Sequence, residues 1–280
     1  MNAQSTTRLA QMPQKALESR FIVGTRVDAT SYEDAVDRCI SWAREGESRY
    51  VCVSTVHMVM EGHDSPAYQH VVNSADLVTP DGVPLVWALR WLGIKGVTRV
   101  YGPELTPQLL KKAADHRIPV GFFGGGTQAA LDRLVSIVRE RFPHLVITYA
   151  YAPPFRPLSP DEDETIVREI TDSGARVLFV GLGCPKQERW MHEHRGRLPA
   201  VMVGVGAAFD FLAGVKPQAL RLVQKMGMEW LFRLATEPRR LWKRYLKHNP
   251  RFVFFFLLQV LGVRQFAPIG AIGLSEGTNG

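Results

Sequence analysis

The chain has 280 residues, of which 46% are hydrophobic and 22% are charged, and its formal net charge is +7. This composition excludes a disordered chain, and the length suits one large globular domain, alone or with an appendage. Cys39, Cys52 and Cys184 have the spacing of neither a disulfide framework nor a zinc site, so we expect a cytosolic protein. The polar N-terminus lacks the apolar segment of a signal peptide, and we expect residues 1–19 to form a flexible leader.

The first hundred residues alternate between strand and helix patterns. We expect a first strand over residues 21–27 and a helix capped by Ser31. The apolar run 50–54 predicts a buried strand that ends at Thr55, followed by two short helices, one starting at residue 56 and one over 67–72. Residues 97–101 resemble a strand and precede a helix that runs from residue 102 to 116.

A turn-forming stretch, residues 79–82, separates apolar Leu77 and Val78 from a helix that begins near Pro84. It places a single carboxylate, Asp81, between the end of a strand and the start of a helix. Two interpretations are open from this position alone. Asp81 caps the helix by accepting a backbone N–H bond, or it is a general base, since open α/β sheets bind ligands beyond the carboxyl ends of their strands.

Three later strands share one design, in which an apolar run enters a glycine-rich turn and then a helix. The strands are residues 118–123, 177–180 and 200–203, and a fourth, 145–150, leads into a proline-rich loop. Strands that alternate with helices and are apolar throughout predict a mostly parallel sheet covered on both faces. We therefore expect a Rossmann-like α/β domain over residues 20–215.

The glycine turns have two interpretations. Backbone N–H groups at such a turn suit a phosphate, but glycines also allow a helix and a strand to pack closely. No dinucleotide fingerprint and no P-loop motif occurs, which counts against the alternative of an NAD(P)-dependent oxidoreductase. We expect no cofactor.

Metal-binding patterns are weak. Asp161 and Asp163 form a D-x-D string, but their place after Ser159 and Pro160 is typical of the acidic first turn of a helix. His192 and His194 would face different sides of a helix, and His57 and His63 also lack ligand spacing. We expect no catalytic metal.

The C-terminal region carries the excess of positive charge, because residues 216–264 contain many Lys and Arg but only two acids, Glu229 and Glu237. We expect one helix over 218–235 and another over 237–247, with Leu241 and Trp242 on an apolar side and the cations on the other. The Phe-rich run 252–261 is half the length needed to span a bilayer. This appendage resembles an interfacial membrane helix, and the alternative is a helix packed on the domain. Residues 265–280 are expected to form a disordered tail.

Taken together, the motifs resemble the WecG/TagA/CpsF family of bacterial glycosyltransferases. The resemblance includes Thr79-Pro-Asp-Gly82 and Gly181-Leu-Gly-Cys-Pro-Lys-Gln-Glu188, and extends from about Phe21 to Arg251. The matching stretches occur in the order 55–60, 77–86, 99–105, 123–126, 181–188, 206–214 and 227–241.

The resemblance implies an inverting, metal-independent transfer from a UDP-sugar to a polyprenyl-diphosphate-linked saccharide, at the inner face of the cell membrane. It makes Asp81 the base and adds Thr55, Arg99 and Gln187 as catalytic residues. The family's tail arginines, which fold over the site, correspond to Arg233, Arg240 and Lys243. The nucleotide-sugar is expected at Gly124, Gly125, Gly126, Gly183, Pro185, Lys186 and Asp210.

The chain departs from the family's pattern at three places, which concern the donor sugar more than the reaction type. His57 replaces an Asn found in other members, Gln218-Ala-Leu220 replaces Arg-Ala-Pro, and Lys243 replaces an arginine. A non-catalytic adaptor for membranes or nucleic acid is a further alternative, but no nucleic-acid-binding module is recognisable, and we expect no nucleic acid partner. Exposed apolar surface around the appendage could also serve a homo-oligomer.

Overall fold

The computed structural model of the chain describes residues 16–215 and 229–270. Most of the predicted leader, part of the predicted helix 218–235 and residues 271–280 of the predicted tail lie outside the described residues.

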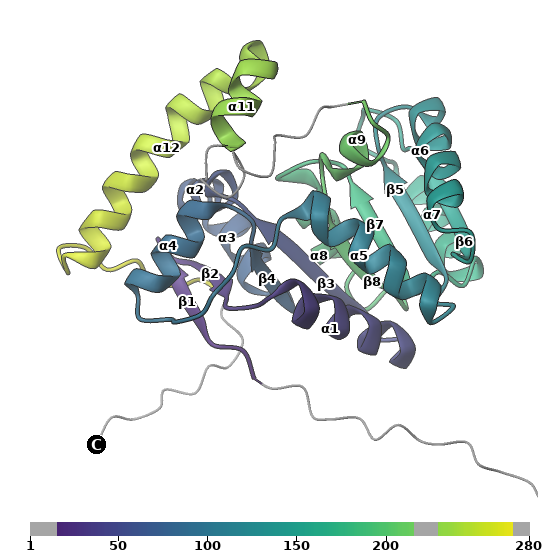
Figure 1. Cartoon of the computed structure of the whole chain (residues 1–280), viewed down its shortest axis with the longest axis horizontal. Helices are drawn as coiled ribbons and strands as arrows, with labels where there is room; N and C mark the ends of the chain where they lie inside the picture. Colours follow the sequence, from purple (N-terminus) through teal and green to yellow (C-terminus); the bar gives the residue numbers. More distant parts are fainter. Residues whose placement is uncertain (1–15, 216–228, 271–280) are drawn as a thin grey trace, which may run out of the picture.

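A six-stranded sheet forms the centre of the protein, and every strand pair in it is parallel (Figure 1). The strand order is β4-β3-β8-β7-β5-β6. The predicted α/β class with a parallel sheet is confirmed. The strands are β3 (Arg49–Ser54), β4 (Leu77–Pro80), β5 (Val120–Gly124), β6 (Ile147–Tyr151), β7 (Val177–Gly181) and β8 (Val201–Gly204).

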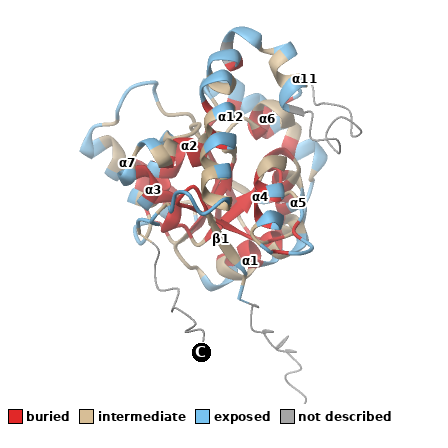
Figure 2. Ribbon diagram, turned by 90° about the vertical axis from the view of Figure 1, so that its left-hand side faces the viewer, coloured by how far each residue is buried: buried red, intermediate tan, exposed pale blue. Residues whose placement is uncertain are grey.

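Helices cover both faces of the sheet because alternate strand residues are apolar on both sides. Val51 and Val53 point to a core shared with α1 (Tyr32–Glu45), α5 (Gly102–Asp115), α6 (Gln128–Arg141) and α9 (Ala208–Leu212). Tyr50 and Cys52 point to the opposite core. The helices in that second layer are α2 (Val56–Asp64), α3 (Pro66–Asn73), α7 (Pro160–Asp172) and α8 (Lys186–Glu193). Figure 2 shows that the buried residues concentrate in the sheet and in the helix faces turned toward it.

The predicted first strand is wrong, because residues 19–28 form an antiparallel hairpin of β1 (Ser19–Ile22) and β2 (Thr25–Asp28). Val23 and Gly24 make the turn with φ values of 51° and 83°. Two successive positive φ values are what a two-residue hairpin turn requires, and Gly24 adopts one without strain. The hairpin packs with α2 and α4 (Val83–Trp91) in a third apolar cluster.

A second correction concerns residues 97–101, which form no strand. The segment is an extended loop held to the end of β4 by a hydrogen bond from the Val100 N–H to the Pro80 carbonyl (3.0 Å). A single backbone hydrogen bond does not make residues 97–101 a strand of the sheet. The acidic string at 161–163 is the first turn of α7, as predicted, and Ser159 and Glu162 form a capping box there.

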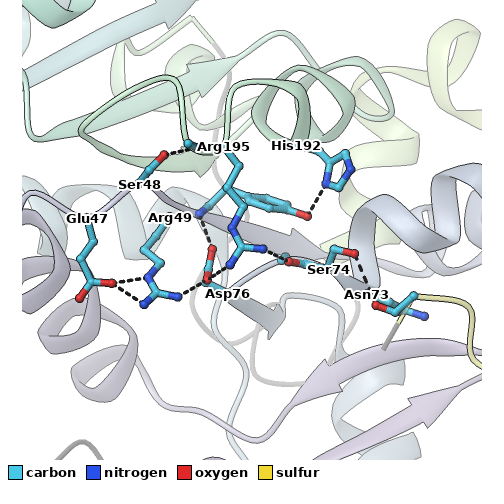
Figure 3. A network of polar contacts seen from close by, with 12 residues as sticks. Glu47, Ser48, Arg49, Asn73, Ser74, Asp76, His192 and Arg195 are labelled. Atoms are coloured by element: carbon cyan, nitrogen blue, oxygen red, sulfur yellow. Dashed lines mark hydrogen bonds and ion pairs between the residues drawn. The ribbon is translucent and has the colours of Figure 1, made fainter. Parts of the chain in front are cut away.

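The buried carboxylate of Asp76 connects the amino ends of β3 and β4 with the segment that follows α8 (Figure 3). Asp76 accepts hydrogen bonds from Arg49 Nη1 (2.7 Å), Arg195 Nη2 (2.8 Å) and the Tyr50 N–H (3.0 Å). Two guanidinium groups and one backbone donor satisfy this carboxylate, which is only 4% exposed. The network lies at the edge of the sheet opposite the carboxyl ends of the strands.

The C-terminal helices are α11 (Glu229–Thr236) and α12 (Pro238–Val260). The predicted end of this helix at residue 247 is wrong, because α12 continues through Pro250 to Val260. The whole helix has 23 residues and is about 35 Å long. A proline at this place removes the hydrogen bond to the carbonyl of Leu246, and Leu246 is exposed, so water can satisfy that carbonyl. Among the described residues, no helix combines the length and the apolar composition that crossing a bilayer demands.

One face of α12 packs on the domain. Phe252 is buried in the third apolar cluster, and Gln259 Nε2 donates a hydrogen bond to the Phe21 carbonyl (2.7 Å). Residues 265–270, which were predicted to belong to the disordered tail, lie against α2 and α3. The Ile269 N–H donates to Gln69 Oε1 (3.1 Å), and Asn73 Nδ2 donates to the Ile269 carbonyl (2.9 Å).

Candidate active site

A cavity of about 540 Å³ lies beyond the carboxyl ends of β3, β4 and β8. In the sheet, β4 lies on one side of β3, and β8, β7, β5 and β6 lie on the other. The direction in which strands are added to the sheet therefore reverses between β3 and β8. Open α/β sheets bind ligands at such a reversal. Residues of α11 and α12 form the opposite wall of the cavity, so the C-terminal helices complete it.

Asp81 lies in this cavity at the end of β4. Its backbone N–H donates to the Ser54 carbonyl (2.9 Å), which fixes the turn against β3. The carboxylate does not cap the next helix, because the N-cap of α4 is Gly82. Instead, Oδ2 accepts a hydrogen bond from the N–H of Gly102, the first residue of α5 (3.4 Å). The capping interpretation for the helix after Asp81 is therefore wrong, and the carboxylate faces the cavity.

Arg99 holds the Asp81 carboxylate from the side of the loop 97–101. Its Nη2 lies 3.2 Å from Asp81 Oδ1, and its Nε donates to the Asp81 carbonyl. The guanidinium also stacks on the ring of Tyr101, 4.1 Å from the centroid. A carboxylate bonded by a guanidinium and a backbone N–H keeps one orientation, which suits a group that must meet a substrate hydroxyl.

Thr55 is the N-cap of α2, and its Oγ1 accepts a hydrogen bond from the Met58 N–H (3.3 Å). Thr55, Val56, His57 and Met58 all line the cavity, so the amino end of α2 opens into it. The helix dipole and the free N–H groups of a first turn favour an anion there.

Gly183 belongs to the turn after β7, and Gln187 lies in the first turn of α8, which follows it. Gln187 is 4% exposed, and its Oε1 accepts from the Gly183 N–H (3.1 Å), while its Nε2 donates to Glu188 Oε1 (2.7 Å). Glu188 also accepts from the Tyr68 hydroxyl (2.9 Å), and burial raises the pKa of the Glu188 carboxyl. The network holds the Gly183 turn at the cavity wall. Gln187 itself lines the cavity, and its catalytic role stays a prediction.

Two arginines from the C-terminal helices face the cavity. Arg233 comes from α11 and lies over the ring of Phe211, 5.6 Å from its centroid, and Arg244 comes from α12. The Nε atom of each is buried and has no hydrogen-bond partner within the part of the chain that the structure describes. Buried donors of this kind need an acceptor, and an anionic ligand supplies one.

The other two predicted tail residues lie elsewhere. Lys243 is exposed beside the ring of Trp242, 5.7 Å from its centroid, and does not line the cavity. Arg240 belongs to α12, and its side chain is outside the described part of the structure.

The predicted nucleotide-sugar residues are divided between two places. Gly183 lines the cavity, whereas Gly124, Gly125, Gly126, Pro185, Lys186 and Asp210 do not. The first glycine turn instead packs against the second. A Cβ on Gly124 would lie 2.6 Å from the Gly181 carbonyl carbon, and the Gly125 N–H donates to the Gly181 carbonyl (3.1 Å). Close packing of the two turns explains Gly124, and a Cβ on Gly125 would lie 3.1 Å from the ring of Phe209.

Several cavity residues were not predicted from the sequence. Those from α12 follow a helical repeat of three and four residues, which marks the side of the helix turned to the domain. This spacing in residues 241–252 is the signal that could have found them. The residues concerned are Tyr101, Trp230, Arg244, Tyr245, His248, Asn249 and Phe252.

Comparison with known proteins adds the family. Residues 20–265 match the model of the glycosyl transferase WecG/TagA/CpsF family. The chain is 29% identical over 210 residues to the N-acetylglucosaminyldiphosphoundecaprenol N-acetyl-beta-D-mannosaminyltransferase of Bacillus spizizenii, covering 75% of this chain and 79% of that protein. It is 32% identical over 191 residues to a protein of the same name from Staphylococcus aureus, covering 67% and 71% of the two chains. With a parallel α/β fold, a carboxylate at the strand ends and a match over most of its length, the chain belongs to the WecG/TagA/CpsF family of glycosyl transferases.

Proposed function

We propose that this glycosyltransferase moves a sugar from a UDP-sugar to a polyprenyl-diphosphate-linked saccharide in the synthesis of a cell-surface polysaccharide. The observation that carries the proposal is the orientation of Asp81. Its carboxylate is fixed by Arg99 and by the Gly102 N–H in a cavity that, among the described residues, has no second acid. Such a carboxylate suits the removal of a proton from an acceptor hydroxyl.

The reaction follows from this placement. The acceptor oxygen attacks the anomeric carbon from the side opposite to UDP, its proton passes to Asp81, and UDP leaves with the electron pair of the broken bond. The new bond forms on the face opposite the old one, so the anomeric configuration inverts. No catalytic metal is required in this scheme, because guanidinium groups can meet the charge that develops on UDP.

Three arginines are available for that charge. Arg99, Arg233 and Arg244 line the cavity together with the amino end of α2. Guanidinium groups bind phosphate oxygens by charge-assisted hydrogen bonds, and the unpartnered Nε atoms of Arg233 and Arg244 are suited to this. A diphosphate held between α2 and the C-terminal helices would place the anomeric carbon near Asp81.

The named relatives support the acceptor class. Their name describes transfer of N-acetylmannosamine to N-acetylglucosaminyldiphosphoundecaprenol. For the present chain we propose an acceptor of the same class, a saccharide on a polyprenyl diphosphate. Since His57 lines the cavity where other members have Asn, the donor sugar is the part of the reaction in which this chain is expected to differ.

The outer face of α12 supports binding to the inner surface of the cell membrane. Exposed apolar residues repeat along it at helical spacing, and exposed Trp87 and Trp91 lie on α4, which packs in the same third cluster. Exposed cations on α12 include Lys243 and Lys247, which attract anionic lipid. We propose that this face rests in the headgroup region as a peripheral anchor. The apolar residues on it are Trp242, Leu246 and Leu257, followed by Leu261 at the C-cap.

The test is a screen of UDP-sugars with the full chain and a short-chain polyprenyl-diphosphate N-acetylglucosamine acceptor. The expected result is release of UDP that requires both substrates, with a product whose new glycosidic bond has the inverted configuration by NMR. Omitting the acceptor is the control for simple hydrolysis. UDP release that is the same without the acceptor, or a product of retained configuration, would contradict the proposal.

A further inference from the structure

Two histidines and one glutamate meet where α12 crosses α2. His57 and Glu61 lie one turn apart on α2, and His248 lies on α12. His57 Nε2 is 3.5 Å from Glu61 Oε1, and His248 Nε2 is 3.6 Å from the same oxygen. One ligand atom from each residue lies within 4.8 Å of the other two.

The distances in this cluster are longer than those of hydrogen bonds. An N–H···O bond has its heavy atoms about 2.7–3.2 Å apart. Two ligands that bind a tetrahedral ion at about 2.0–2.1 Å are separated by about 3.4 Å. The separations of both imidazoles from Glu61 are close to that value, and the two rings meet at 72° rather than stacking face to face. These two contacts to Glu61 fit ligand geometry better than hydrogen bonding.

We propose that His57, Glu61 and His248 bind a divalent transition metal ion of the zinc class, which fastens α12 to the catalytic domain. Two imidazoles and one carboxylate form a ligand set used by open zinc sites. His57 and His248 also line the cavity, so a water or a ligand atom in the cavity can take the fourth position. The ion would hold the cavity wall in place, and the sugar transfer by Asp81 needs no step through it.

The ligand set also suits a divalent cation. Imidazole binds a metal through a neutral ring nitrogen, and the Glu61 carboxylate supplies negative charge that offsets the cation.

His248 is buried at the crossing of the two helices, with a side chain that is 4% exposed. Its Nε2 lies 3.6 Å from Glu61 Oε1, beyond hydrogen-bond distance. A metal ion between these two atoms would give the buried ring nitrogen a partner.

The test is metal binding by the full chain after treatment with a chelator. We expect Zn²⁺ to bind with a stoichiometry of one in calorimetry, and His57→Asn and His248→Gln each to weaken binding by at least tenfold, since ligand loss costs more than loss of a supporting residue. His63→Gln is the matched control. His63 lies on the same helix and packs against Phe255 (4.3 Å between ring centroids), outside the cluster, so its variant should bind as the parent does.

Two other readouts distinguish this site from surface binding. Co²⁺ in place of Zn²⁺ should give the visible absorption of a four-coordinate ion, and Zn²⁺ should slow hydrogen exchange in α12 of the parent but not of His248→Gln. Equal Zn²⁺ affinity in the parent and in both variants, or unchanged exchange in α12, would overturn the proposal. These readouts do not use glycosyl transfer, so they stand or fall independently of the proposed function.

Discussion

Replacing Asp81 with Asn removes the proposed base while keeping the size of the side chain. A general base contributes roughly 10²–10⁴-fold, or about 3–5.5 kcal/mol of the activation barrier, so kcat should fall by that factor. The change also breaks the ion pair with Arg99. In this pair the Asp81 side chain is 14% exposed and the Arg99 side chain is 20% exposed. The Asn carbonyl can still accept one hydrogen bond, so we expect the free energy of unfolding to fall by about 1–3 kcal/mol.

The two effects are separated by steady-state kinetics of UDP release, measured well below the unfolding transition. Loss of a base lowers kcat and leaves KM for the donor nearly unchanged, whereas a disordered cavity raises KM as well. Asp163→Asn is the matched control, because Asp163 pairs with Arg197 (2.8 Å) outside the cavity and away from α12. It should lose stability but keep its turnover. A kcat for Asp81→Asn within threefold of the parent, with the fold intact, would refute the assignment of the base.

Three further predictions concern an arginine of the cavity, the outer face of α12 and the buried carboxyl of Glu188. Arg244→Gln should raise KM for the UDP-sugar by about tenfold or more, the effect of losing one charge-assisted bond, while Lys243→Gln, outside the cavity, should not. Leu257→Asp should weaken sedimentation with anionic liposomes by at least tenfold, since burying one leucine contributes about 1.5–3 kcal/mol, and equal sedimentation would exclude this face as the anchor. Glu188 holds a proton in the folded state that the unfolded chain loses above about pH 4.5, so the free energy of unfolding should fall as pH rises from there, by up to about 1.4 kcal/mol per unit. Denaturant unfolding of Glu188→Gln should lack this slope, and a slope that persists would assign it to another group.

Local pattern was sufficient to predict the sheet and the strand ends. Continuous apolar runs marked the buried strands, and parallel strands bring their carboxyl ends to one edge, so Thr55, Asp81 and the turn at Gly183 meet in one cavity. The N-cap Ser31 was predicted by the same kind of local rule.

Contacts between distant segments decided the rest. Whether Asp81 caps α4 or accepts from α5 depends on where the loop 97–101 lies, and that loop has the composition of a strand but only one backbone bond to β4. α12 can continue through Pro250 because the carbonyl that loses its hydrogen bond belongs to Leu246, which is exposed to water. Local sequence pattern does not reveal that exposure. His248 joins His57 and Glu61 only because α12 folds back on α2, so spacing within one segment could not reveal that cluster.

The two faces of α12 would link the proposed lipid binding to the proposed chemistry. Its inner face supplies Arg244, Tyr245 and His248 to the cavity wall, and its outer face carries the exposed apolar row that ends at Leu261. The acceptor in the proposed reaction has the same two parts, a diphosphate-linked sugar and a polyprenyl chain. A helix that contacts the membrane on one side and the diphosphate on the other would bring the sugar to Asp81 without moving the lipid out of the bilayer. Because both faces belong to one helix, a substitution that loosens α12 from α2 should lower liposome binding and turnover together. A substitution on the outer row should lower liposome binding but not turnover of the short-chain acceptor.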